Sequence, residues 1–513
     1  SSAFQGTSHV FSRRITFWFI PLGLVVLHTA GALWLAATLN LWIDEAYSAH
    51  TSGAGPWYAY EQARYFELQP PLYFVLLALW RTLGEGLFWG RLFSVCCATG
   101  FLLCAWIAVR QYVPRLAPGW VLAPLAISPF LLHSASDMRV YALLLCLSGA
   151  ALVVFHRAFL APDATLWAKA ALVPLALAGL HTQYFFGFLL VAFAAGLLLR
   201  GVWRELFQYT GLMALTGILF LPQLLIVPEQ VAQHTGGAAK ADVGLFQIAA
   251  FLPRRIQYYL WPVHDDWSRY VRWPIFLVFW GVLLGCFLRG VRQWRSRDAW
   301  LLGATVVLGA LLTGTMVAVT GRELMAQRHT AVWLLPATLS VYLVLAYGGG
   351  AQRTRLLAAW TIVATVLNIG VLADTYTPYA RTGDYARVAE HLRTQVPPGA
   401  PVLVFNAEAG IALDWYYDGP MRVLPAPEDW QAYNLEEFVL RDTAPIARAV
   451  RTEDGDPADE VWLVNNVSPG ERNYLGMDYN LERLLDYLEA RYECLSTTRF
   501  FENEVRQYRR RTN

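Results

Sequence analysis

The stretch ITFWFIPLGLVVLHTAGALWLAATLNLWIDEAYSAH, residues 15–50, joins a long apolar run to two adjacent carboxylates. The apolar part covers residues 15–38, and about 20 apolar residues are enough for a helix to cross a membrane. Asp44 and Glu45 follow at the point where such a helix would leave the hydrocarbon. Carboxylates are unfavourable at that depth, so the pair is either a catalytic pair or the solvated end of a helix.

The composition of the whole chain places it in a membrane. Of its 513 residues, 56% are hydrophobic and 15% are charged, whereas soluble domains carry about 25% charged residues. The net charge is +2, and Lys and Arg are scattered at segment ends, so no basic block suited to nucleic acid is present. Of the six cysteines, only Cys494 lies in a polar region, which leaves no paired disulfide framework.

Long apolar runs recur along the chain and predict about eleven transmembrane helices. The runs are 15–38, 91–110, 119–133, 139–156, 167–181, 184–200, 207–227, 273–289, 299–320, 330–348 and 355–374. A further apolar stretch, residues 70–83, opens with two prolines. At a rise of about 1.5 Å per residue, a helix of that length barely crosses the hydrocarbon core.

The distribution of basic residues decides whether residues 70–83 span. Lys and Arg favour cytoplasmic loops. If residues 70–83 do not span, Arg13, Arg14 and the arginine cluster at 289–297 fall on one side of the membrane. If they did span, every later loop would change sides and the cluster would face outward. We therefore expect this stretch to lie at the membrane surface or to re-enter it.

The non-cytoplasmic face then collects the unusual polar residues of the chain. It receives the outer loop 39–90, with its surface helices, the turns 133–137 and 181–184, the loop 228–272, the segment 322–329 and the tail from about residue 375. This common sidedness predicts a single active site that faces away from the cytoplasm.

The tail differs in pattern from the rest of the chain. VPPGAPVLVFN (396–406) and DEVWLVNN (459–466) resemble strands, whereas DYARVAEHLRTQ (384–395) and NLERLLDYLEARY (480–492) have helical spacing. No glycine-rich nucleotide loop is present. The expected fold is an α-helical polytopic membrane protein, with a transmembrane catalytic domain over residues 1–374 and a small soluble α/β domain over residues 375–513.

Several motifs share the outer face with Asp44 and Glu45. They are QPPLYF (69–74), WGRLFS (89–94), SASDMRVYAL (134–143) and QRHTAVWLLP (327–336). In their order along the chain and their common side of the membrane, these motifs resemble those of the lipid-dependent glycosyltransferases of the GT-C superfamily. The resemblance is greatest to the protein O-mannosyltransferase and aminoarabinose transferase group. That group has a carboxylate pair after the first helix, a Pro-Pro-Leu-Tyr stretch and an Arg-Leu at the next helix start. The resemblance covers most of residues 15–350.

The resemblance implies an inverting glycosyl transfer from a polyprenyl-phosphate-linked sugar to an acceptor hydroxyl outside the cytoplasm. In the family the first acidic loop supplies the catalytic carboxylate, and the match falls on Asp44, with Glu45 beside it. A general base in this position takes the proton of the acceptor hydroxyl as its oxygen attacks the anomeric carbon.

The polyprenyl phosphate that leaves needs fixed cations, and arginine pairs with phosphate oxygens through two parallel hydrogen bonds. The candidates lie at outward-facing helix ends: Arg91, Arg139 with Tyr141, and Arg328 with His329. Each has an alternative role. Arg91 is also suited to pairing with Asp44 or Glu45, Arg139 to an ion pair with Asp137, and Arg328 with His329 to anchoring in lipid headgroups.

Candidates for contacts to the substrate or acceptor are Gln69, Tyr73, His50, Asp265 and Trp267. Gln69 stands where relatives often have a histidine before the two prolines. Asp265 and Trp267 belong to WPVHDDWSRYVRWP (261–274), which is rich in aromatic residues. Such rings form either a belt at the membrane interface or a platform for a sugar.

Four outward histidines, His50, His133, His181 and His329, raise the question of a metal site. No pair of them has the spacing of a ligand set, and the Asp-x-Asp pattern of the oligosaccharyl branch of the superfamily is missing from the first loop. The spacing therefore does not support a divalent metal, although such a metal stays an open alternative, and no other cofactor is expected.

Two other function classes stay open at this point. A lipid-linked glycan polymerase or ligase shares many spans and outer arginines, but depends on a long outer loop late in the chain. A transporter of lipids or sugars is expected to show inverted repeats and interrupted helices. The composition favours a bacterial inner membrane with a periplasmic site, and no motif encodes the sugar or whether the acceptor is a glycan, a lipid or a protein.

Overall fold

The computed structural model describes residues 3–235, 245–264, 266–290, 314, 327–376, 384–427, 434–467, 473–474 and 477–511. The chain forms two compact units, each assembled from separate stretches. The first contains Ser1–Ala37, Phe88–Ile226 and Lys240–Thr375, and the second contains Thr38–Leu87, Val227–Ala239 and Tyr376–Asn513.

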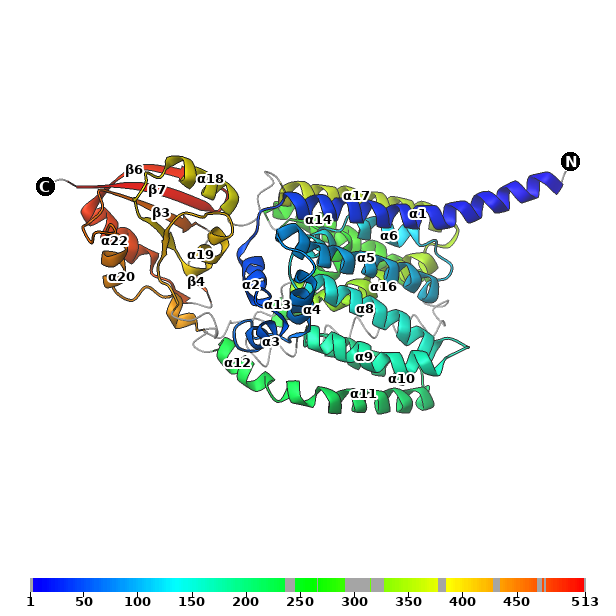
Figure 1. Ribbon diagram of the computed structural model, residues 1–513. Coiled ribbons are helices and arrows are strands. Elements are labelled where there is room, and N and C mark those ends of the chain that lie inside the picture. Colours follow the sequence, from blue (N-terminus) through cyan, green and yellow to red (C-terminus); the bar gives the residue numbers. More distant parts are fainter. Residues whose placement is uncertain are drawn as a thin grey trace. The chain divides into compact units, whose positions relative to one another are not determined.

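The first unit is helical, and its long helices run side by side (Figure 1). Helix α8 packs against α9 and α10, α9 packs against α11, and α14 packs against α16. The elements are α1 (Ala3–Thr38), α5 (Leu87–Tyr112), α6 (Gly119–Ala126), α7 (Pro129–Ala135), α8 (Tyr141–Phe155), the π-helix η1 (His156–Leu160), α9 (Leu166–Thr182), α10 (Phe186–Leu199), α11 (Trp203–Leu224), α13 (Leu245–Leu260), α14 (Arg269–Gly290), the 3-10 helices η2 (Gln327–Trp333) and η3 (Gly350–Gln352), α16 (Leu334–Gly348) and α17 (Arg353–Tyr376).

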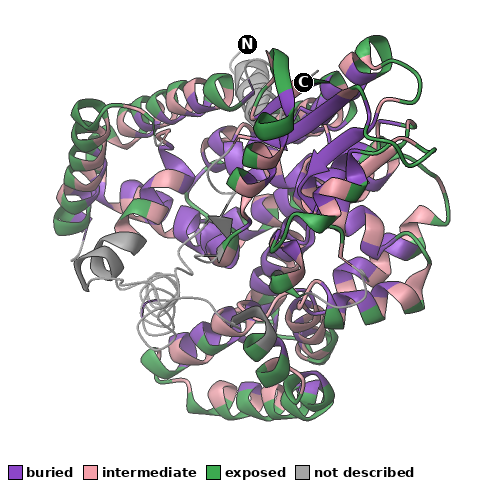
Figure 2. Cartoon of the chain, turned by 90° about the vertical axis from the view of Figure 1, so that its left-hand side faces the viewer, coloured by how far each residue is buried: buried purple, intermediate pink, exposed green. Residues whose placement is uncertain are grey.

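This unit is built to sit in lipid. Within the described residues, six helical segments are long and apolar enough to cross a membrane, and α9 and α10 are shorter apolar helices. Large apolar side chains remain exposed on the outer helices, such as Ile218 at 68%, Leu277 at 64% and Leu288 at 63%, and Figure 2 shows exposed faces along these helices. Soluble proteins rarely expose so much apolar surface, so lipid covers these faces. The chain is an α-helical polytopic membrane protein.

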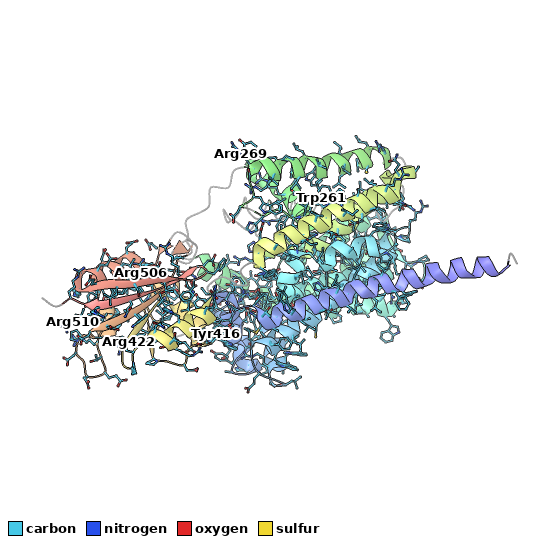
Figure 3. The ribbon with its side chains drawn as sticks, turned by 90° about the horizontal axis from the view of Figure 1, so that it is seen from above. Trp261, Arg269, Tyr416, Arg422, Arg506 and Arg510 are labelled. Atoms are coloured by element: carbon cyan, nitrogen blue, oxygen red, sulfur yellow. The ribbon has the colours of Figure 1, made fainter. Side chains whose placement is uncertain are left out.

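Aromatic packing joins several helices inside the first unit. Trp261, labelled in Figure 3, packs its ring against Trp360 at 4.4 Å and against Phe279 at 5.5 Å between ring centroids. Trp261 directly follows α13, Trp360 belongs to α17, and Phe279 belongs to α14. Aromatic pairs at such distances stabilise packing beyond the area they bury.

Neither of the predicted spans 119–133 and 299–320 corresponds to a single described helix. The expected single helix over 119–133 is wrong, because α6 and α7 are separate. Pro129 lacks an N–H donor and its ring disfavours helical geometry at the preceding residue, and Ser128 is extended, with ψ of 125°. The predicted span 299–320 lies outside the described residues apart from position 314.

The outer loop contributes three short helices to the second unit: α2 (Ile43–Thr51), α3 (Pro56–Tyr65) and α4 (Leu72–Arg81). Helix α4 has ten residues, which gives a length of about 15 Å, half the thickness of a bilayer core. A straight helix of that length is too short to cross a bilayer, and the surface-lying or re-entrant placement of residues 70–83 stays a prediction. Helix α12 (Val227–Thr235) joins α3 through a hydrogen bond of 3.1 Å from Gln230 Nε2 to the Arg64 carbonyl.

The rest of the second unit is the α/β domain predicted for the tail. Its main sheet has the order β2-β1-β3-β7-β6, in which β1 is parallel to β2 and β3, and β7 is antiparallel to β3 and β6. The elements are α18 (Tyr385–Gln395), β1 (Val402–Phe405), α19 (Ala407–Asp414), β2 (Met421–Val423), η4 (Leu435–Phe438), α20 (Ala444–Ala449), β3 (Glu460–Asn466), β4 (Asn473–Tyr474), β5 (Met477–Asp478), α22 (Leu481–Arg491), β6 (Tyr492–Arg499) and β7 (Asn503–Arg510).

The two strands and two helices predicted in the tail are confirmed as β1, β3, α18 and α22. Alternation along β1 and β3 places Leu403 and Leu463 on one face, where they pack with Leu484 of α22. On the other face, Trp462 lies against His391 of α18, at 6.1 Å between ring centroids. Helices thus cover both faces of the sheet.

Candidate functional site

Helix α2 carries the carboxylate pair in its first turn. Trp42 precedes the helix in an extended conformation without a side-chain cap. Acidic side chains in a first turn interact favourably with the positive end of the helix dipole, which explains why the helix begins here. Glu45 is fully buried, whereas Asp44 is partly exposed. Of the two, Asp44 is therefore the carboxylate that a substrate can reach.

Helix α4 holds the C-terminal end of α2. Arg81 Nη1 donates to the Ala49 carbonyl at 2.5 Å and to Ser52 Oγ at 2.8 Å. Beside it, His50 Nε2 lies 3.0 Å from the Tyr58 hydroxyl of α3. Burial lowers the pKa of His50, so this histidine is neutral at physiological pH. His50 thus belongs to the packing of the loop helices in this structure.

The other end of α2 is fixed by the α/β domain. The Tyr47 hydroxyl donates to Glu408 Oε1 of α19 at 2.8 Å. The Leu41 amide donates to the Tyr416 hydroxyl at 2.7 Å, and Tyr416 is labelled in Figure 3. Asn40 Nδ2 donates to Asp384 Oδ1 at 2.7 Å. The loop that carries Asp44 is therefore tied to the C-terminal domain by hydrogen bonds from Asn40, Leu41 and Tyr47.

Glu408 was not predicted from the sequence, and the pKa of its carboxyl group is clearly perturbed. Burial raises its pKa to about 7, and the nearby Asp44 carboxylate raises it further, while hydrogen bonds from Tyr47 and Asn406 oppose the shift. Asn406 also caps α19, because its side chain accepts from the Glu408 and Ala409 amides. The signal in the sequence was FNAE, an asparagine cap and an acid directly after a buried strand.

Arg91 lies in the first unit, near the start of α5, and is fully buried. Its Nη1 donates to the Ala36 carbonyl of α1 at 3.0 Å. The neighbouring Gly90 lies against Met138, and a Cβ at that position would collide with the Met138 sulfur. The turn before α8 therefore approaches α5 closely. Arg91 directly follows Gly90 and Arg139 directly follows Met138, so each arginine is next in sequence to a residue of this contact.

The SASDMRVYAL segment is buried at the start of α8. Arg139 is 6% exposed and Tyr141 is 8% exposed. Asp137 is fully buried, and its carboxylate lies 3.6 Å from His133 Nε2, one turn earlier. A buried arginine and a buried acid in one turn give this end of α8 a concentration of charge that is unusual inside a membrane protein.

Arg328 and His329 lie in η2, which packs against α8 and α10. The His329 ring lies 5.4 Å from the Phe185 ring, and Thr330 is hydrogen-bonded to the Tyr259 hydroxyl at 2.5 Å. Arg328 itself is exposed. The three groups of phosphate candidates thus belong to α5, the start of α8 and η2, all within the first unit, and their role stays a prediction.

The remaining candidates are divided between the two units. Gln69 and Tyr73 belong with Asp44 to the second unit. Tyr73 is fully buried against Phe74. The backbone N–H of Gln69 donates to the Ala63 carbonyl at 2.9 Å. Trp267 belongs to the first unit, and Asp265 lies outside the described residues.

Trp267 is engaged with α17. Its indole Nε1 donates to Asp374 Oδ2 at 2.5 Å, and a Cβ at Gly370 would lie 3.4 Å from its ring. This packing uses the indole N–H and brings the six-membered ring next to Gly370. As for metals, no group of three or more His, Cys, Asp or Glu side chains among the described residues could hold an ion.

Comparison with known proteins places the chain by its fold. No protein family model and no curated protein matches the sequence. Among solved structures, ArnT from Cupriavidus metallidurans in the apo state matches with a TM-score of 0.57 and 16% identity, over 95% of this chain and 98% of ArnT. The same protein bound to undecaprenyl phosphate matches with a TM-score of 0.53 and 15% identity, over 97% and 98% of the two chains. The chain therefore has the fold of ArnT over nearly its whole length.

Proposed function

We propose that the protein is an integral membrane glycosyltransferase that moves a sugar from a polyprenyl-phosphate-linked donor to an acceptor hydroxyl. The observation that carries the proposal is the shared fold with ArnT over nearly the whole of both chains. One of those ArnT structures holds undecaprenyl phosphate, which makes a polyprenyl phosphate the donor class to test. The carboxylate pair on α2 supplies the group that the chemistry requires.

In the proposed reaction, the acceptor oxygen attacks the anomeric carbon of the donor in a single displacement. The bond from that carbon to the phosphate oxygen breaks, and the polyprenyl phosphate leaves with the electron pair. Asp44 takes the acceptor proton as general base. One displacement inverts the configuration at the anomeric carbon.

The leaving phosphate gains charge, and fixed arginines stabilise that charge best where water is excluded. Arg91 and Arg139 are buried in the first unit, and Arg328 with His329 lies in η2. We assign donor-phosphate binding to these residues together with Tyr141. We further propose that the site and the α/β domain face the periplasm of a bacterial inner membrane, as the arginine distribution favours.

The test is transfer by the purified full-length protein in nanodiscs, supplied with a panel of radiolabelled polyprenyl-phosphate sugars and a membrane extract as acceptor. Asp44→Asn is compared with Asp163→Asn, which changes an exposed aspartate in the turn after η1. We expect transfer by the wild type and by Asp163→Asn, and transfer roughly 10²–10⁴-fold slower by Asp44→Asn, which still binds donor. A wild type that binds no lipid-linked sugar would overturn the proposed function. Equal turnover by wild type and Asp44→Asn would remove Asp44 as the base.

A further inference from the structure

Glu408 is the one acidic side chain of the first turn of α19, and it meets α2 on the face that carries Asp44. Asp44 and Tyr47 are three residues apart in a helix, so their side chains project from neighbouring positions on the same surface. Tyr47 donates to Glu408 at 2.8 Å, and the Asp44 carboxylate is close enough to act on Glu408 by charge repulsion. A carboxyl group of the α/β domain thus adjoins the proposed base.

Each side of the contact has a further interaction beside it. On one side, the Asn406 side chain caps α19 by accepting from the amides of Glu408 and Ala409. On the other side, the ring of Tyr47 packs edge-on against Phe66, at 5.3 Å between centroids. Helices α2 and α19 pack directly against each other. The Tyr47–Glu408 hydrogen bond therefore joins two helices that are each anchored beside it.

We propose that Glu408 is a positioning residue for Asp44: its ionised carboxylate holds Tyr47, and thereby fixes the turn of α2 that carries the base. The proposal rests on the proposed function, since it assigns a role in that same transfer. It places one determinant of the reaction in the C-terminal domain, 361 residues from its hydrogen-bond partner in the chain.

The charge of Glu408 decides how strongly Tyr47 is held. A hydroxyl donating to a carboxylate makes a shorter and stronger hydrogen bond than one donating to a neutral carboxylic acid. Because the pKa of Glu408 is raised to about 7, the ionised fraction increases with pH across the neutral range. Transfer is therefore expected to increase as pH rises through about 7.

Among the described residues, the groups that perturb Glu408 belong to α2 and to the end of β1. Tyr47 and Asp44 face it from α2, and Asn406 faces it from the end of β1. From α18, which also packs on α19, Arg393 bonds the Tyr416 carbonyl beyond the C-terminal end of α19. The dependence on pH is thus expected to follow Glu408 and its α2 neighbours.

The first experiment measures transfer against pH for wild type, Glu408→Gln, Tyr47→Phe and Glu482→Gln. Glu482 is the matched control, because it is also a first-turn glutamate of a helix in this domain but is exposed. We expect the rise through about pH 7 in wild type and in Glu482→Gln, and a flat profile in Glu408→Gln. Tyr47→Phe is expected to give a flat profile as well, because it removes the hydroxyl through which Glu408 holds α2. An unchanged profile in Glu408→Gln would overturn the proposal.

The second experiment does not depend on transfer activity. A series of infrared difference spectra against pH follows the protonated carboxyl of Glu408, identified by its loss in Glu408→Gln. Asp44→Asn should lower the pKa read from this band, because it removes the repelling charge, and Tyr47→Phe should raise it. If no donor is transferred but both shifts occur, the proposed function fails while the link between the two carboxylates stands. If neither variant shifts the band, the proposal is wrong even in an active enzyme.

Discussion

Tyr47 and Glu408 are joined by a hydrogen bond of 2.8 Å across 361 residues of sequence. This bond connects the helix of the predicted base to the α/β domain, and it lies one helical turn from Asp44. The C-terminal domain is therefore part of the framework of the candidate site.

Asp44→Asn tests the base itself. General base catalysis contributes roughly 10²–10⁴-fold to a rate, so the turnover of this variant should fall by a factor in that range. Donor binding should persist, because the base acts on the acceptor. The measurement is single-turnover transfer at saturating donor, and a loss of donor binding equal to the loss of rate would contradict the assignment.

Glu408→Gln should change stability in a way that depends on pH. The pKa of Glu408 is raised from 4.5 to about 7 in the folded protein, so its ionisation disfavours the folded state as pH rises between these values. Below the lower value wild type and variant should unfold alike. Near pH 8, above the folded pKa, the variant should be more stable by on the order of 2 kcal/mol, allowing for partial exposure.

The measurement is thermal unfolding in detergent at both ends of that range, with Glu482→Gln as the exposed control. A stabilisation of Glu408→Gln that is equal at all pH values would mean that charge is not its cause.

Gly90→Ala tests the close approach between α5 and the turn before α8. The added methyl group would collide with the Met138 sulfur, and overpacking of this kind destabilises by about 1–3 kcal/mol. Shortening the neighbour in Gly90→Ala/Met138→Ala should recover part of that loss and part of any loss in donor binding. Thermal unfolding and donor binding are measured on the single and double variants, and strictly additive effects would contradict the contact.

Arg328→Ala tests phosphate binding at η2. Arg328 is exposed, so its removal should leave stability almost unchanged. A hydrogen bond to a charged group contributes about 1.5–3 kcal/mol, which corresponds to a roughly 10- to 100-fold weaker Kd for a polyprenyl phosphate. Arg355→Ala, at an exposed position near the start of α17, is the matched control. Equal affinities in the two variants would assign Arg328 to headgroup anchoring.

Arg81→Ala tests the support of α2 from the other side. Arg81 satisfies the Ala49 carbonyl and Ser52 Oγ at the end of that helix, and an unsatisfied buried acceptor costs about 1–3 kcal/mol. We expect faster proteolysis of the loop 38–87 and slower transfer, whereas Arg115→Ala should behave as wild type. Mass-spectrometric mapping of limited proteolysis gives the readout, and unchanged cleavage in the loop would exclude this support.

The fold was largely predictable because lipid imposes strong rules on sequence. Apolar runs such as 91–110 and 355–374 coincide with α5 and α17, since a helix is the simplest way to satisfy a backbone in hydrocarbon. The break between α6 and α7 was missed because both halves are equally apolar, and a single proline decided the local geometry. The hairpin of β6 and β7 was missed because charged residues fill strands whose outer positions face water.

The candidate site was predictable only in part. Asp44 stood out because it follows the first apolar run. Arg91 and Arg139 stood out because they are predicted on the non-cytoplasmic side, whereas Lys and Arg favour cytoplasmic loops. Glu408 gave no comparable signal, since an acid in a soluble domain is ordinary. Only the fold brings it to Tyr47, and only burial raises its pKa.

The assembly of the second unit from distant stretches also sets an order of events during biosynthesis. Asn40 must wait for Asp384, 344 residues later, and at about 5–20 residues per second translation needs roughly half a minute to supply it. During this interval the first helix is already inserted in the membrane, whereas the loop that carries Asp44 does not yet have the α/β domain to bind. A ribosome that stops early therefore releases a chain whose proposed base is unsupported, so that only completed polypeptides acquire a finished reaction centre.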